Sequence, residues 1–178
     1  MAAPGLAWLK SETKDVDNNG ANLGFSYGII TEFAFNEAEN YAFATGLQAS
    51  YRGGKLTKDS TKTKIKLQYL ELPITLKMKT NEIGAIKYFG QFGIVPGINL
   101  KADADSSVKD LTTSHVYKNR IHPFNISLLV ALGLEYNLAG NTSGLVSIGF
   151  NNGLLDILKD SETKAITNLV SLNLGVLF

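Results

Sequence analysis

The side chains best suited to catalysis gather in one polar stretch of the chain. His115 and His122 lie in or beside a segment that also contains Ser106, Ser107 and Ser114. A histidine that takes the proton of a serine hydroxyl would create a nucleophile able to hydrolyse an acyl ester of lipid A. None of these three serines stands in a nucleophile motif. The sequence therefore predicts no enzyme, and a lipid A hydrolase is kept as the catalytic alternative.

Three aspartates in the same stretch are the best candidates for a metal site. Asp103, Asp105 and Asp110 offer the oxygen ligands that calcium prefers. Their spacing lacks the glycine and the final glutamate of an EF-hand loop, so we expect a solvated acidic loop. The chain contains no cysteine, no zinc pattern and no glycine-rich phosphate loop. We therefore predict no metal and no cofactor.

Length and composition limit the class of protein. The 178 residues are 44% hydrophobic and carry a net charge of +1, which predicts a single domain over residues 1–178. Lysines and arginines form no basic stripe, so we expect no nucleic-acid partner. The sequence has no run of about 18 uncharged apolar residues, so no transmembrane helix is predicted. The first residues lack the basic and apolar regions of a signal peptide, and we interpret them as a mature chain with an added Met.

The stretch from Tyr69 to Met78 shows the pattern that governs most of the chain. Its residues alternate, so that leucine, isoleucine and methionine share one face, while Glu71, Thr75 and Lys77 share the other. About eight such segments follow one another, and prolines at 73 and 96 are expected to interrupt the ladder. The approximate segments are 4–14, 22–35, 41–52, 69–78, 85–100, 124–138, 146–151 and 166–178.

The two faces differ in size, and this difference decides the environment. A closed sheet of about eight strands has an interior just wide enough to be filled by side chains. The bulky face cannot be packed inside it, so the small and polar face must point inward and the bulky face toward lipid. The pattern predicts an all-β, closed, antiparallel, up-and-down transmembrane barrel with short periplasmic turns and longer external loops.

Two kinds of segment should mark the edges of the membrane. Residues 53–64 and 102–122 are predicted to be external loops, because they are polar and rich in turn-forming residues. Aromatic residues near strand ends are predicted to form interfacial belts. They are Tyr41, Tyr51, Tyr69, Tyr88, Phe124 and Tyr136.

A set of charged residues falls on the inward face. They are Glu32, Arg52, Glu71, Lys77 and Glu135. Because buried charges must be paired, we predict a structural network in the lumen. A proton or ion path is the alternative.

Three short motifs resemble a known family. They are the sequence Tyr-Leu-Glu-Leu-Pro at 69–73, Phe-Gly-Gln-Phe-Gly at 89–93 and Gly-Leu-Glu-Tyr at 133–136. Their order and spacing resemble the small outer-membrane β-barrels of Bacteroidetes that include the PorT-like proteins. The resemblance implies an outer-membrane address, and a role for Phe178 in the signal that the barrel-assembly machinery reads. It implies little about activity, although PorT itself is associated with type IX protein secretion.

Three functional hypotheses follow. The first is a non-enzymatic barrel in the bacterial outer membrane, in contact with its lipid, whose external loops or outer wall engage an unidentified protein partner. A diffusion pore is a variant of it, disfavoured because about eight strands leave no continuous channel. The second is a lipid-modifying enzyme at the barrel rim, and the third is a soluble lipocalin-type ligand-binding barrel.

Overall fold

The computed structural model describes nearly the whole chain, and almost all of it is β-strand. The described residues are 1–11, 17–18, 20–35, 40–58, 61–108, 111–116, 121–140, 142–159 and 165–178. Within these ranges, no helix has the length and apolar character needed to cross a membrane. The strands are β1 (Ala2–Ser11), β2 (Asp17–Asn18), β3 (Asn22–Ala34), β4 (Tyr41–Lys58), β5 (Thr61–Glu71), β6 (Ile74–Lys79), β7 (Ile86–Val108), β8 (Leu111–Val116), β9 (Phe124–Ala139), β10 (Thr142–Gly153) and β11 (Ala165–Leu177).

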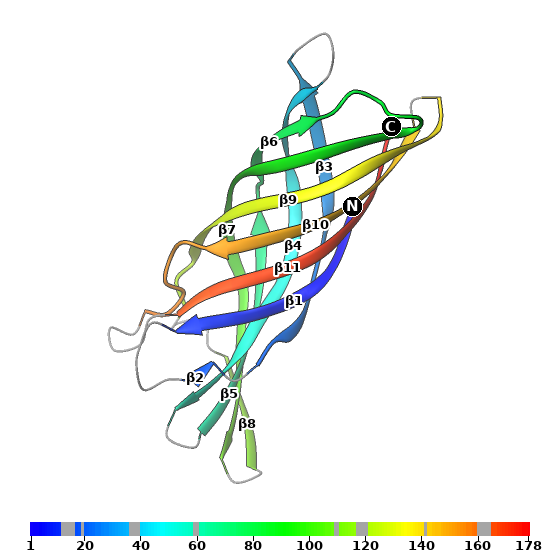
Figure 1. Ribbon diagram of the computed structural model, residues 1–178. Helices are drawn as coiled ribbons and strands as arrows, with labels where there is room; N and C mark the ends of the chain where they lie inside the picture. The colour runs from blue at the N-terminus through cyan, green and yellow to red at the C-terminus, as the bar shows by residue number, and fades with distance from the viewer. Residues whose placement is uncertain are drawn as a thin grey trace.

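The sheet closes on itself. Strand β1 pairs with both β3 and β11, and neighbours along the chain pair in sequence from β3 round to β11. Strands β5 and β6 together occupy one strand position in the barrel, here called a stave, because β4 and β7 pair with both of them. All these pairs are antiparallel, which gives an up-and-down barrel of eight staves (Figure 1). The predicted fold is confirmed.

Bulky side chains cover the outside of this barrel. Leu132 is 70% exposed and Leu128 is 41% exposed on the outer face of β9, whereas Ser127, next to Leu128, is fully buried. Glu71 is only 1% exposed, although Leu72 beside it is 45% exposed. A soluble lipocalin-type barrel would require the opposite arrangement of these faces. The predicted inside and outside are therefore confirmed.

The ladder is interrupted beside both of the predicted prolines. The ladder breaks at Leu72 and Pro73, between β5 and β6, and the Leu72 N–H donates a hydrogen bond to the Pro96 carbonyl over 2.9 Å. Pro96 itself stays inside β7, opposite Ile126. On its other side, however, the ladder from β7 to β5 and β6 skips Val95 and Pro96, so the expected interruption at Pro96 is confirmed on that side. A register shift of β7 lies opposite Gln68 and Tyr69.

Two stretches predicted as loops are hairpins. Strand β4 runs on to Lys58 and pairs with β5 down to Thr61, and β7 runs to Val108 and pairs with β8. The prediction failed because these stretches of threonine, lysine and aspartate show no apolar face. The hydrogen bonds between the strand backbones form without one. In Figure 1 these hairpins extend from the lower end of the barrel, away from the labelled termini.

The outer face also carries the predicted aromatic residues, with one exception. Five of them are exposed on the outer face. They are Tyr41, Tyr51, Tyr88, Phe124 and Tyr136. Tyr69 is fully buried inside the barrel, because it shares its side of β5 with Glu71. Its assignment to an interfacial belt is wrong.

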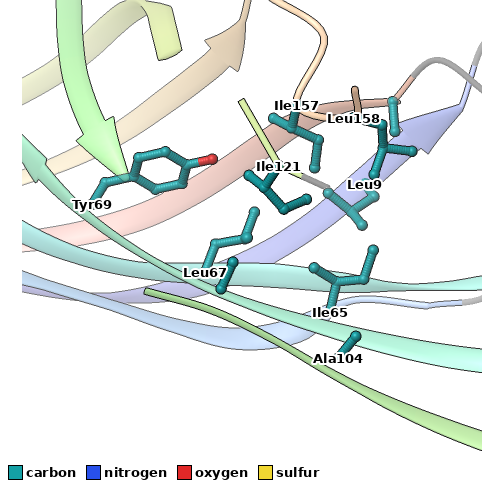
Figure 2. Close-up of a cluster of buried hydrophobic side chains, with 10 residues drawn as sticks. Leu9, Ile65, Leu67, Tyr69, Ala104, Ile121, Ile157 and Leu158 are labelled. Carbon is teal, nitrogen blue, oxygen red and sulfur yellow. The ribbon is translucent and has the colours of Figure 1, made fainter. Parts of the chain in front are cut away.

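An apolar cluster fills the hairpin end of the lumen. It combines inward-facing residues of β1, β5, β7 and β11 with the segments around Ile121 and Ile157 (Figure 2). Asp156 holds the second segment across the opening, since one carboxylate oxygen accepts hydrogen bonds from the N–H groups of Leu158 and Ala165, each 3.0 Å long. The cluster consists of Leu9, Ile65, Leu67, Tyr69, Ala102, Ala104, Ile121, Ile157, Leu158 and Ala165.

Candidate functional site

The five charged residues predicted for the lumen all lie inside the barrel wall, in two groups. The first group is an ion pair between β4 and the end of β5. Arg52 Nη2 lies 2.5 Å from Glu71 Oε1, and the two side chains are 0% and 1% exposed. The Gln48 side-chain amide donates to the other carboxylate oxygen over 2.7 Å. Glu71 therefore has a partner on each oxygen, as a buried carboxylate requires.

The second group joins lysines of β6 to glutamates of β3 and β9. Lys77 Nζ lies 2.5 Å from both Glu32 Oε1 and Glu135 Oε1. Lys79 Nζ reaches the same two glutamates, at 2.9 Å and 3.3 Å. Two ammonium groups and two carboxylates balance, so the group adds no net charge to the lumen.

Lys79 is a member of this group that the sequence analysis missed. It lies two residues after Lys77 and therefore on the same inward face of the strand. That spacing was the signal that could have identified it. The side chain is 14% exposed, compared with 1% for Lys77, so Lys79 lies at the more open edge of the group.

An aromatic ring supports the Lys77 ammonium from a third side. Lys77 Nζ lies 4.1 Å from the centre of the Phe89 ring, within the range of a cation–π contact. Gly133 makes room for this ring, because a Cβ there would lie 2.8 Å from Phe89 Cζ and 2.4 Å from the Val146 carbonyl oxygen. A glycine in β9 thus permits the position of an aromatic side chain in β7.

The lumen is organised in layers along its length. The inward-facing residues of β5 and β6 pass in order from Ile65 and Leu67 in the apolar cluster, through Glu71, to Lys77 and Lys79. A cavity of about 910 Å³ opens at this last layer, with Glu32, Lys79 and Glu135 in its wall. The rest of its lining is mainly small, amide and hydroxyl side chains. Its polar lining includes Ser26, Gln48, Gln91, Asn151, Ser171 and Asn173. The lining reaches Gln48, which binds Glu71, so the Arg52–Glu71 pair and the apolar cluster separate the cavity from the hairpin end.

The candidate catalytic residues lie at the opposite end from this cavity. His115 is in β8, opposite Ala104, and the exposed His122 donates its backbone N–H to the Ile157 carbonyl. The side chains of Ser106, Ser107, Ser114 and His115 lie outside the part of the chain whose side chains are described. The hydrolase alternative therefore gains no geometry from the described residues.

A serine elsewhere does match the letters of a nucleophile motif. Residues 24–28 read Gly-Phe-Ser-Tyr-Gly. In hydrolases that motif forms a sharp turn between a strand and a helix. Here Ser26 is buried in the middle of β3, and its hydroxyl donates to the Ser50 hydroxyl over 2.9 Å. It is part of the polar lumen wall.

The predicted acidic loop is part of a β-hairpin. Asp103 lies 3.0 Å from Lys101 Nζ, and Asp105 lies 2.8 Å from Lys66 Nζ. Asp110 lies outside the described residues. Over the described ranges, no three histidine, aspartate or glutamate side chains come together as a metal site would require. Phe178 is fully exposed at the end of β11, and its role in assembly stays a prediction.

Comparisons with known proteins agree with this architecture. Residues 5–159 match the profile of the outer membrane protein beta-barrel domain family. No curated protein sequence matches the chain. Among solved structures, Neisserial surface protein A is similar at a TM-score of 0.54 and 15% identity, over 99% of this chain and 93% of that one. The attachment invasion locus protein Ail of Yersinia pestis is 15% identical, with a TM-score of 0.41, over 97% of this chain and 95% of Ail.

The family match covers most of the barrel, from β1 to the segment that closes its hairpin end. It agrees with the outward-facing apolar side chains and with the closed sheet, both of which suit a protein that crosses a membrane with strands. This chain therefore belongs to the outer membrane protein beta-barrel domain family and is a β-barrel protein of the bacterial outer membrane.

Proposed function

We propose that this protein acts without catalysis, by binding a partner through the hairpins that extend beyond its lipid-facing band. The observation that carries the proposal is that the lumen is closed between the Arg52–Glu71 pair and the hairpin end. An apolar cluster, the Arg52–Glu71 pair and the Lys77 group lie one after another across the barrel. A barrel with such an interior offers no route for a solute, so its function is expected at its outer surfaces.

The hairpins provide a surface that suits this role. On β4 the outward-facing Tyr51 is followed by a further stretch of strand to Lys58, and β7 and β8 extend in the same direction. The added strands are hydrogen-bonded to one another, so they form an ordered polar sheet outside the band. An ordered surface loses less conformational entropy on binding than a flexible loop does.

The narrower assignments rest on other grounds. A PorT-like identity within the Bacteroidetes, and with it a secretion-related role, is supported by the three sequence motifs quoted above. The lipid A hydrolase is the second candidate function, favoured only by the presence of His115 and His122 in the same hairpin region. Replacing both histidines with alanine would leave lipid A acylation unchanged if the non-enzymatic proposal is correct.

Site-specific photo-crosslinking in intact cells tests the partner-binding proposal. A photo-reactive residue at Thr112, in β8, is compared with one at Glu82, which is exposed at the opposite end of the barrel. We expect the Thr112 position to give a defined crosslinked species whose partner is identified by mass spectrometry. The same species at both positions, or none at Thr112 and at neighbouring positions of the hairpin, would contradict the proposal.

A further inference from the structure

The outer face of the β4–β5–β7 wall carries an excess of positive charge. Four lysines on this face, here called the lysine patch, are Lys55, Lys64, Lys66 and Lys101. All four are exposed, and Asp103 and Asp105 are the carboxylates beside them. Among the side chains that the structure describes on this face, four positive charges against two negative ones leave a surplus of two.

The two aspartates are already engaged by two of the lysines. Lys66 binds Asp105 at 2.8 Å, and Lys101 binds Asp103 at 3.0 Å. The Asp105 carboxylate raises the pKa of Lys66 above its ordinary value, so Lys66 stays charged. Lys55 and Lys64 have no carboxylate at ion-pair distance among the described side chains.

Lys55 and Lys64 are also directly opposite each other in the sheet. They are cross-strand partners of β4 and β5. Like charges in this position repel and destabilise the pairing of the strands. On its other side Lys64 is opposite Asp105 of β7, but the Asp105 carboxylate forms its ion pair with Lys66. An anion placed between the two ammonium groups would remove this repulsion, so the site is arranged to gain energy from a negatively charged ligand.

The height of the patch suits the headgroup layer of a membrane. Tyr51 and Gln68 are opposite each other, with the Gln68 amide donating to the Tyr51 hydroxyl over 3.1 Å, and this pair belongs to the interfacial level. Each further pair of residues along a tilted barrel strand rises by about 5 Å along the membrane normal. Lys66 lies one such step above this level and Lys64 two steps. The headgroup layer is roughly 5–8 Å thick, so Lys66 lies in it. Lys64 and its partner Lys55, about 10 Å up, lie just outside it, where their long side chains can bend back toward the headgroups.

We infer that Lys55 and Lys64 bind the phosphate group of a lipid headgroup in the outer leaflet, with Lys66 and Lys101 contributing to the field around it. A phosphate accepts several charge-assisted hydrogen bonds from ammonium groups. The lipid tails would pack against the apolar wall directly below, where Leu70 and Leu72 lie on the same side of the strand. The site thus contacts both parts of one lipid molecule.

Native mass spectrometry of the detergent-solubilised barrel tests this inference. The probes are phosphorylated lipid A, the same lipid after enzymatic removal of its phosphates, and inorganic phosphate. The double variant K55Q/K64Q removes two charges and keeps a polar, unbranched side chain at each position. The matched control, K10Q/K159Q, removes two exposed lysines that lie outside the patch.

We expect the wild type and the control to retain phosphorylated lipid A, and K55Q/K64Q to bind it about thirtyfold more weakly. Dephosphorylated lipid A should bind no better than it does to K55Q/K64Q. The inference is overturned if the two double variants lose the same affinity, because the effect would then be general charge. It is also overturned if K55Q/K64Q binds like the wild type, or if millimolar inorganic phosphate displaces the lipid. A heat-dependent gel shift of each variant establishes that it is folded, and crosslinking from Thr112 tests the partner proposal separately.

Discussion

Arg52 and Glu71 form an ion pair, 2.5 Å long, inside the barrel wall, where neither side chain is more than 1% exposed. Arg52→Met would leave the Glu71 carboxylate buried without its cation. We expect the free energy of unfolding to fall by about 3–5 kcal/mol, the usual cost of breaking a buried pair from one side. Urea unfolding in lipid vesicles, followed by tryptophan fluorescence, measures it.

The double variant R52M/E71Q is the control for this prediction. It removes both charges, and Gln48 can still form a hydrogen bond with the new amide at position 71. We expect most of the lost stability to return, because replacing both partners of a buried pair is often nearly neutral. A double variant as unstable as R52M would mean that packing, and not charge, explains the loss.

Lys77 and Lys79 contact the same two glutamates but differ in burial. Lys77 also lies over the Phe89 ring, and its side chain is 1% exposed compared with 14% for Lys79. We predict that Lys77→Met lowers the free energy of unfolding more than Lys79→Met does, because water can partly replace the more exposed ammonium group. The same unfolding measurement compares them. Equal losses would argue against a layered interior.

Gly133 is predicted to be intolerant of any side chain. A Cβ there would meet the Ser147 Cβ at 2.3 Å and Phe89 Cζ at 2.8 Å, so the wall or the ring must move. Gly133→Ala should cost about 1–3 kcal/mol as overpacking. Gly144→Ala, one strand away, would meet only Leu138 Cδ1 at 3.8 Å and should be nearly neutral. Thermal unfolding of both variants in detergent decides, and equal midpoints would contradict the packing described for Phe89.

The layered lumen also predicts an absence of ion conduction. The purified barrel inserted into a planar bilayer should give no stepwise currents, since apolar side chains close the hairpin end and ion pairs close the middle. A porin in the same bilayer shows that channels would be detected. Regular, reproducible steps from this chain would contradict the filled interior.

The strands and their two faces could be predicted from the sequence because the barrel imposes a strict period of two. Most neighbouring residues, such as Ser127 and Leu128, contrast in size. Large side chains fit on the side that faces lipid, and small ones fit in the narrow lumen. The partners of Glu71 and Lys77 are less local. Their positions in the alternating pattern placed them on the lumen face. Only the register between β3, β4, β6 and β9 decides which carboxylate contacts which cation.

The apolar cluster could not be predicted in the same way. Ile121, Ile157 and Leu158 lie outside the segments that alternate with a period of two, and their burial depends on contacts with β1 and β5, far away in sequence. The available signal was that Ile65 and Leu67 fall on the lumen face of their strand. Two large apolar residues on a face that is otherwise small and polar indicate that side chains fill this end of the lumen. The hairpins were missed for a related reason, because hydrogen bonds between backbones leave no trace in hydrophobic periodicity.

The central claim, that the bulky face contacts lipid, is tested most directly at Leu132. The chain has a single tryptophan, so Trp8→Phe with Leu132→Trp places the only indole at an outward position that is 70% exposed. In lipid vesicles we predict blue-shifted emission that brominated acyl chains quench and aqueous iodide does not, whereas Trp8→Phe with Lys64→Trp shows the reverse. An indole at position 132 that iodide quenches, and brominated lipid leaves unchanged, would contradict the account.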